Sequence, residues 1–142
     1  MRALGVDLGS KRIGIAVSDS TGTIASPLTV VHRSRSSRRD LDEIARIARD
    51  EEATVIVVGL PLTLRGEIGP AAEAAIAEAG RLATVVGVPV DTHDERLTTV
   101  TAERSLIEAG IRGEQRRRVV DKVAAAVMLQ SWLDARRARS AT

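Results

Sequence analysis

The sequence predicts a single α/β domain built on a mixed five-stranded sheet with helices on both faces. Two observations support this fold class. Three strand-like segments follow one another directly in the first 31 residues, which is typical of an antiparallel meander. From residue 37 onward, strand-like and helix-like segments alternate, which implies parallel strands joined by crossover helices. The length of 142 residues fits one domain with a buried core.

The first two strands are expected over about residues 2 to 18. By the two-residue period of a strand, Leu4, Val6 and Leu8 share one face, whereas Asp7 falls on the other face among small residues. The second strand repeats this division into an apolar face and a face of Gly, Ala and Ser. A carboxylate among small residues leaves room for a large polar ligand, such as a metal ion with a phosphate. The alternative is that the acid caps a turn while the glycines let the strands pack closely.

A hairpin turn and a third strand complete the expected meander. The turn is predicted over residues 19–22, with Asp19 organising it, and the strand over residues 23–31. Pro27 lies inside this strand, which predicts an edge position or a bulge. The basic stretch over residues 33–39 is expected to be mostly a solvated loop.

The second half begins with an amphipathic helix expected over residues 37–52, because its apolar residues recur at helical spacing. Five more elements are expected: a strand over 54–58, a helix over 69–84, a strand over 88–93, a helix ending at 110 and a helix over 114–137. The strand over 54–58 is continuously apolar, which predicts burial on both faces. In the last helix, the apolar positions are expected to include Val119, Val123, Ala126, Val127 and Leu133. The domain is expected to cover residues 1–138, followed by a short polar tail over 139–142.

The composition excludes several classes of protein. There is no cysteine, so neither a disulfide nor a thiolate metal site is available. No apolar run approaches the ~20 residues of a membrane span, and the N-terminus shows no signal-peptide pattern, so a cytoplasmic protein is expected. The net charge of +2 permits nucleic-acid binding without arguing for it. With one Trp and no Phe or Tyr, stacking of single-stranded bases is nearly excluded, and any nucleic acid would be held through its backbone and shape.

Acidic residues occur in three segments that the fold can bring together. Asp7 is on the first strand, Asp94 and Glu95 are at the end of the fifth strand, and Asp121 is in the last helix. Strand ends of an α/β sheet gather functional groups into one crevice. Carboxylates without cysteine suit Mg²⁺ or Mn²⁺, and two such ions flanking a phosphodiester would activate water and stabilise the leaving oxygen. Surface salt bridges are the alternative role for each acid.

Four stretches of the chain resemble the YqgF family, also called RuvX, of RNase H-fold nucleases, which are relatives of the Holliday-junction resolvases. These stretches are residues 6–19 (VDLGSKRIGIAVSD), residues 58–62 (VGLPL) with Gly66, residues 94–99 (DERLTT) and residues 120–125 (VDKVAA). They occur in the family's order and span nearly the whole chain. The resemblance therefore implies an RNase H-like fold.

The resemblance also implies which residues are functional. Asp7, Glu95 and Asp121 are expected to be the catalytic, metal-binding acids, holding two Mg²⁺ or Mn²⁺ ions, with Asp94 as the second choice. Four basic residues flank the acids and are expected to hold phosphate oxygens: Lys11, Arg12, Arg96 and Lys122. His93 is expected to be a packed or surface residue rather than a general base.

The function implied by the resemblance is a divalent-metal-dependent nuclease in 5′-end processing of pre-16S rRNA, with structured RNA and a ribosomal or precursor-ribosome partner. The alternative is a Holliday-junction resolvase acting on four-way DNA, which would require a symmetric homodimer. The same acids hydrolyse either backbone. A non-catalytic nucleic-acid-binding module is a third reading, against which the full set of acids argues. The opening Asp-x-Gly hairpin also resembles that of actin-like sugar kinases, but those close two domains around ATP, whereas one domain is expected here.

Overall fold

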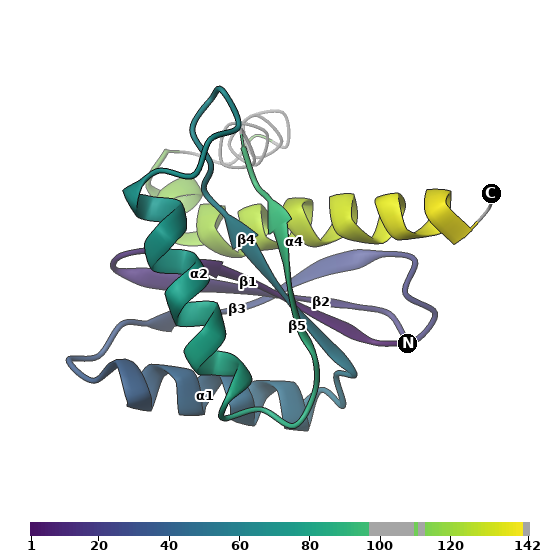
Figure 1. Cartoon of the computed structure of the whole chain (residues 1–142), viewed down its shortest axis with the longest axis horizontal. Helices are drawn as coiled ribbons and strands as arrows, with labels where there is room; N and C mark the ends of the chain where they lie inside the picture. The colour runs from purple at the N-terminus through teal and green to yellow at the C-terminus, as the bar shows by residue number, and fades with distance from the viewer. Residues whose placement is uncertain (97–109, 111–112, 141–142) are drawn as a thin grey trace.

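A five-stranded sheet lies between helices in the computed structural model, which describes residues 1–96, 110 and 113–140 (Figure 1). In chain order the described elements are β1 (Ala3–Leu8), β2 (Arg12–Ser18), β3 (Ala25–His32), α1 (Ser37–Asp50), β4 (Val55–Leu60), α2 (Pro70–Ala83), β5 (Val90–Asp94) and α4 (Gly113–Ser140). The helix expected to end at residue 110 falls outside the described residues.

The sheet has the strand order β3-β2-β1-β4-β5. Strands β1, β2 and β3 pair antiparallel, whereas β4 pairs parallel with both β1 and β5. The predicted mixed sheet is therefore confirmed. Strand β3 lies at one edge of the sheet. Pro27 has no backbone N–H, and at an edge this does not cost the sheet an interior hydrogen bond. The register of β2 against β3 also shifts between Ile15 and Ala16, so the edge and the bulge both occur.

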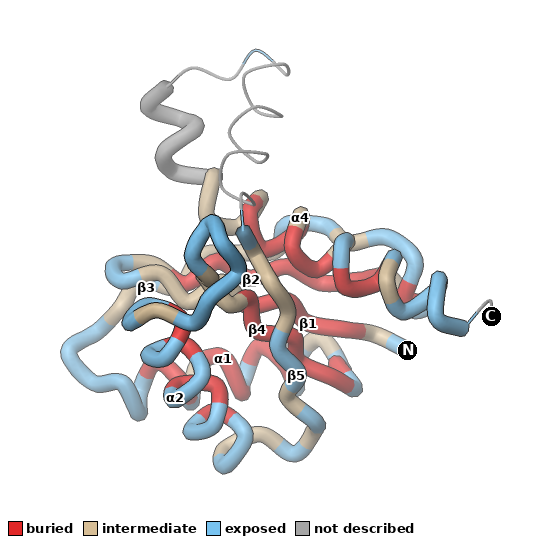
Figure 2. Tube along the Cα trace, turned by 45° about the horizontal axis from the view of Figure 1, so that its top comes forward, coloured by how far each residue is buried: buried red, intermediate tan, exposed pale blue. Residues whose placement is uncertain are grey.

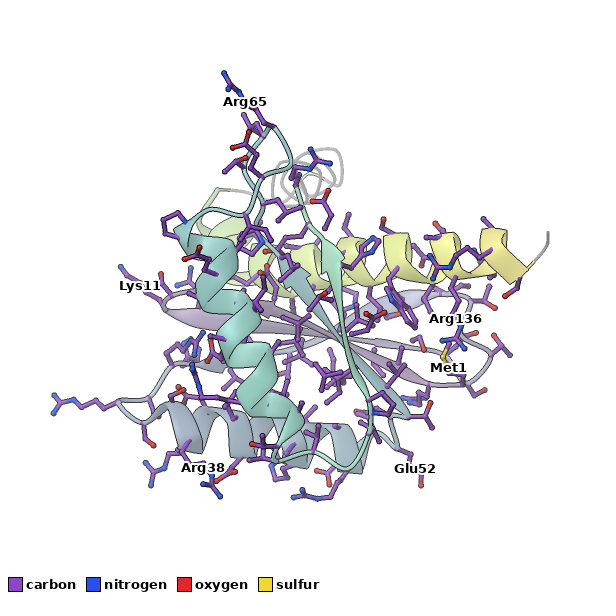
Figure 3. The ribbon with its side chains drawn as sticks, in the orientation of Figure 1. Met1, Lys11, Arg38, Glu52, Arg65 and Arg136 are labelled. Atoms are coloured by element: carbon purple, nitrogen blue, oxygen red, sulfur yellow. The ribbon has the colours of Figure 1, made fainter. Side chains whose placement is uncertain are left out.

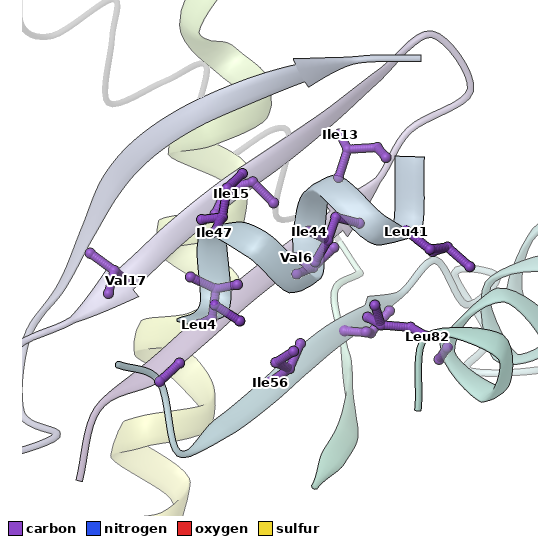
Figure 4. Packing of buried hydrophobic residues seen from close by; sticks show 14 residues of the cluster. Leu4, Val6, Ile13, Ile15, Val17, Leu41, Ile44, Ile47, Ile56 and Leu82 are labelled. Atoms are coloured by element: carbon purple, nitrogen blue, oxygen red, sulfur yellow. The ribbon is translucent and has the colours of Figure 1, made fainter. Parts of the chain in front are cut away.

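The two faces of the sheet are covered by different helices, and a separate apolar core fills each side. Helices α1 and α2 cover the face that carries Leu4, Val6, Ile13 and Ile15, and Figure 4 shows the side chains of α1 pointing toward these strands. Helix α4 covers the other face, where its apolar residues pack on alternate residues of β1, β2 and β4. Figure 2 shows both cores as buried segments on either side of the strands. As predicted, β4 is buried on both of its faces.

Helix α4 rests on the sheet through residues that the sequence pattern only partly identified. Its buried side chains are Ala124, Ala125, Ala126, Met128, Leu129, Trp132 and Leu133. Val123 and Val127, expected among the apolar positions, are only half-buried, and the side chain of Val119 lies outside the described residues. Alanines, which allow the closest approach to the sheet, mark the inner face of the helix better than valines do. The helix continues to Ser140, and the domain boundary at residue 138 stays a prediction.

Arg33 is an exception within the solvated loop expected over residues 33–39. Its two terminal nitrogens donate to the carboxylate of Glu78 in α2 at 2.5 and 2.9 Å, and its Nε donates to the carbonyl of Gly9 at 2.9 Å. This side chain therefore ties α2 to the turn between β1 and β2.

No helix in the described part of the chain is long and apolar enough to cross a membrane.

Candidate active site

The candidate site lies on the α4 side of the sheet, where β1 ends. Asp7 pairs in register with Gly14 of β2, and both residues belong to the face that α4 covers. A Cβ atom on Gly14 would lie 2.0 Å from the carbonyl oxygen of Asp121 and 2.4 Å from its carbonyl carbon. The backbone of α4 therefore rests directly on β2 at this glycine. Because a larger residue would separate the two elements, Gly14 is what brings Asp121 beside Asp7.

A second glycine positions Glu95, which follows the end of β5. The backbone N–H of Glu95 donates to the carbonyl of Leu60 at 3.0 Å, and its side chain lies over Gly59 of β4. A Cβ atom on Gly59 would lie 2.3 Å from Oε2 of Glu95 and 2.9 Å from its Cδ. The carboxylate thus occupies the space that a side chain at this strand position would fill, on the same face of the sheet as Asp7.

The sequence left open whether Asp94 or Glu95 points into the site, and the structure separates them. Glu95 is hydrogen-bonded to Asp7. Asp94 instead accepts hydrogen bonds from Arg96, from Nε at 2.7 Å and from the backbone N–H at 2.8 Å. Of the two neighbours, only Glu95 therefore contacts the acid on β1.

The contact between Asp7 and Glu95 holds two carboxyl groups in a buried place. Burial raises the pKa of Asp7 to about 6; the negative charge of Asp121 adds to the rise, and the hydrogen bond from Glu95 opposes it. Burial also raises the pKa of Glu95 to about 8, to which the charges of Asp7 and Asp94 and the hydrogen bond contribute. These directions fit a pair that shares one proton at neutral pH, with Glu95 as the donor. Oε2 of Glu95 is buried without a hydrogen-bond partner among the described residues.

Asp121 is the third acid of the site, and it forms an ion pair with an arginine of the same chain. Its Oδ2 accepts a hydrogen bond from Nε of Arg12 at 2.6 Å. Arg12 is two residues before Gly14 on β2, so it lies on the same face of the strand. Within the described ranges, no three His, Cys, Asp or Glu side chains stand as a ready-made metal site. The structure thus pairs Asp7 with Glu95, while Asp121 lies beside them in an ion pair with Arg12.

The four basic residues expected to hold phosphate fall into two groups. Arg12 is paired with Asp121, and Arg96 is paired with Asp94. Lys11 and Lys122 form no ion pair within the part of the chain that the structure describes, and Figure 3 shows Lys11 projecting from the hairpin of β1 and β2. Arg96 also lies beside Gly66, whose φ of 82° favours glycine.

The structure also places two further residues that the sequence analysis discussed. His93 is half-buried, its Nε2 lies 2.9 Å from Oγ of Ser131, and burial lowers its pKa. Asp19 accepts hydrogen bonds from the hydroxyl of Thr21 at 2.6 Å and the N–H of Thr23 at 2.8 Å. These hydrogen bonds lower the pKa of Asp19 to about 2 and show that it organises the hairpin turn.

The fold and the site define a nuclease-like domain of the RNase H class. The fold is similar to that of RuvC from Thermus thermophilus, solved in complex with a Holliday junction substrate, with a TM-score of 0.60, 20% identity and 96% coverage of each chain. A second structure of Thermus thermophilus RuvC is similar with a TM-score of 0.55, 19% identity and 97% coverage of each chain. The predicted RNase H-like fold is thereby confirmed.

The chain belongs to the RuvX family, whose sequence model, described as a Holliday junction resolvase, matches residues 1–135. A relative from Mycobacterium sp. (strain KMS), named "Putative pre-16S rRNA nuclease", is 50% identical over 138 residues, covering 96% of this chain and 82% of the relative. A relative of the same name from Myxococcus xanthus is 49% identical over 137 residues, covering 96% of this chain and 90% of the relative. The family resemblance that the four sequence stretches predicted is confirmed.

Proposed function

We propose that this chain is a divalent-metal-dependent nuclease that hydrolyses phosphodiester bonds, acting in the cytoplasm on the 5′ end of pre-16S rRNA. The observation that carries the proposal is the buried contact between Asp7 and Glu95, with Asp121 held beside them by the contact at Gly14. The substrate follows from the name of relatives that are about half identical to this chain over most of their length.

The residues of the site fit a divalent cation. All its candidate ligands are carboxylate oxygens, which Mg²⁺ and Mn²⁺ prefer. Oε2 of Glu95 is buried without a hydrogen-bond partner among the described residues, which suits a metal ligand. Burial raises the pKa values of Asp7 and Glu95, and neighbouring negative charge adds to the rise; a bound cation would offset both effects. Asp7, Glu95 and Asp121 are therefore the residues that would hold the metal, and Asp94 is the second choice because Arg96 already engages it.

Each part of the chain has a distinct task in the proposed reaction. When bound, two Mg²⁺ or Mn²⁺ ions would supply an activated water and stabilise the leaving oxygen. The pair of Asp7 and Glu95 must release its shared proton before both carboxylates can act as ligands, so cation affinity should increase with pH. Lys11 and Lys122, which form no ion pair within the described ranges, are placed to attract the phosphate backbone.

The description of the family's sequence model favours a second candidate, the resolution of four-way DNA junctions. The carboxylate chemistry is the same for both backbones. Junction resolution would require two active sites on two strands, and therefore a symmetric homodimer. Processing of pre-16S rRNA would instead involve a ribosomal or precursor-ribosome partner.

The test compares cleavage of two labelled substrates, a pre-16S 5′-leader RNA and a mobile four-way DNA junction, in Mg²⁺ or Mn²⁺. The variants are Asp7→Asn and, as a matched control, Asp42→Asn, which removes an exposed acid of α1 on the opposite face of the sheet. Cleavage of the RNA that Asp7→Asn abolishes and Asp42→Asn retains would establish the proposed function. Paired symmetric nicks in the junction would favour the resolvase instead. Binding of either substrate without cleavage would indicate a non-catalytic module.

A further inference from the structure

The ion pair between Arg12 and Asp121 joins two elements that are 109 residues apart in sequence. It lies at the edge of the acidic site, where 38% of the Arg12 side chain and 25% of the Asp121 side chain are exposed. Because the guanidinium is partly solvated, it can leave the carboxylate for water without the large cost of stranding a buried charge. The ion pair is thus close and direct, yet Arg12 can leave Asp121 and be replaced there by another cation.

The backbone beneath this pair does not depend on it. Gly14 brings β2 into direct contact with the carbonyl of Asp121, and the apolar core around Leu129 and Trp132 holds α4 on the sheet. Departure of Arg12 would therefore leave the carboxylate of Asp121 at the site. Only the side chain of the arginine has to move.

The charges at the site set a guanidinium and a divalent cation in competition for Asp121. The negative charge of Asp121 acts on Asp7, so the guanidinium at Asp121 offsets part of the repulsion among the acids. A divalent cation bound by the same carboxylates would offset it more strongly and would repel the guanidinium. The two positive groups are therefore alternatives for one carboxylate.

We infer that Arg12 is a built-in counter-ion that competes with the divalent cation for Asp121 and is released to bind a phosphate when the cation enters. This inference rests on the proposed function and adds an order to it: the cation binds first, and only then does the guanidinium become free. Released Arg12 lies next to Lys11 at the end of the hairpin, and its planar fork suits two oxygens of one phosphate. The chain thus couples cation binding to the assembly of its phosphate-binding group.

The comparable pair of Arg96 with Asp94 has a different arrangement. Arg96 contacts Asp94 within a single local turn, and its Nη1 also reaches the carbonyl of Leu64 at 3.4 Å. The hydrogen bonds given for Asp94 go to Arg96, whereas Asp7 is the hydrogen-bond partner of Glu95, so a cation on Asp7 and Glu95 is not expected to displace this arginine. The exchange is assigned to Arg12 alone.

The test is calorimetric titration of the full chain with Mn²⁺, without substrate. Replacing Arg12→Gln removes the competitor and should tighten Mn²⁺ binding about threefold to tenfold, the range expected for loss of a partly exposed ion pair. Lys11→Gln is the matched control, because it removes the same charge from the neighbouring position, where Lys11 forms no ion pair with the described residues. It should change the affinity less than twofold. Arg12→Lys, which keeps the charge but not the fork, should give an intermediate affinity.

A second readout follows the arginine directly. In the wild-type protein, the Nε–H nuclear magnetic resonance signal of Arg12 should shift on addition of Mg²⁺ as its hydrogen bond to Asp121 is lost. Unchanged or weaker Mn²⁺ binding by Arg12→Gln, or an equal gain in Lys11→Gln, would overturn the inference. Tighter Mn²⁺ binding by Arg12→Gln in a protein that cleaves neither substrate would support the inference and overturn the proposed function. Cleavage of a substrate, together with an unchanged Mn²⁺ affinity of Arg12→Gln, would support the proposed function and overturn the inference. If no variant binds Mn²⁺, both the inference and the proposed function are overturned.

Discussion

Replacing Gly59→Ala tests whether the position of one carboxylate controls the activity of this site. The added Cβ would lie 2.3 Å from Oε2 of Glu95, whereas an ordinary contact needs about 3.4 Å. The carboxylate of Glu95 must therefore shift by about 1 Å, since the strand backbone cannot yield within the sheet. A misplacement of this size at a catalytic centre typically costs about 100-fold in rate, or about 2.7 kcal/mol in the barrier. Overpacking should also lower the free energy of unfolding by about 1–3 kcal/mol.

The assay for Gly59→Ala combines metal-dependent cleavage of the RNA leader, Mn²⁺ titration and urea unfolding. Gly80→Ala is the matched control, because a Cβ there meets no atom within 4 Å and the position is inside α2. This control should keep full activity and gain up to about 1 kcal/mol of stability, since alanine favours the helix. If Gly59→Ala folds normally and retains activity and Mn²⁺ affinity within threefold, the positioning of Glu95 by this glycine is refuted.

Substitutions at three other positions test the forces that hold the site together. Gly14→Ala should lower the free energy of unfolding in urea by about 2–4 kcal/mol, because the backbone carbonyl of Asp121 cannot move away as a side chain can. A loss of less than about 1 kcal/mol would contradict the close contact of α4 with β2. Arg33→Ala leaves the carboxylate of Glu78 buried without its partner and should cost about 2–4 kcal/mol, whereas Arg33→Lys should recover part of it; equal unfolding midpoints would argue against the ion pair. In metal-free protein the pKa of Asp7 is higher in the folded state than in the unfolded chain, so the folded state binds more protons and the free energy of unfolding should fall as pH rises from about 4 through 6. Asp7→Asn should therefore be more stable than wild type in EDTA at pH 8 by about 1–3 kcal/mol, with little difference at pH 4, and a gap that widens toward low pH would reverse the argument.

Much of the fold follows from local patterns in the sequence. Alternation along β1 assigned Leu4 and Val6 to one core and Asp7 to the other face, because a strand has a strict two-residue period. Pro27 marked the edge strand, since proline lacks the N–H that a central strand needs. The inner face of α4 was harder to predict, because its contact with the sheet depends on small residues rather than on a stripe of large apolar ones.

The sequence predicted residues for the candidate site but not the contacts that these residues make. The sequence named Asp7, Glu95 and Asp121, yet it did not show that Arg12 would occupy the carboxylate of Asp121. That contact depends on how closely α4 approaches β2, and its signal in the sequence was the small residues on the Asp7 face together with Ala124 and Ala125 of the helix. The position of Gly59 under Glu95 likewise follows from the parallel pairing of β4 with β5, which joins segments 36 residues apart.

Acids and glycines occur together at the site, although both lower the stability of the fold. Each glycine inside a strand costs about 0.5–1 kcal/mol relative to alanine, and burial of Asp7 and Glu95 adds the penalty that their raised pKa values express. The two apolar cores offset these terms, since β4 is buried against both helical layers directly below the site. A chain selected for stability alone would place apolar side chains where Glu95 lies over Gly59 and where Asp121 lies against Gly14. Because these two glycines instead admit acids to a buried place beside Asp7, the arrangement supports the proposed cationic ligand better than it supports packing alone.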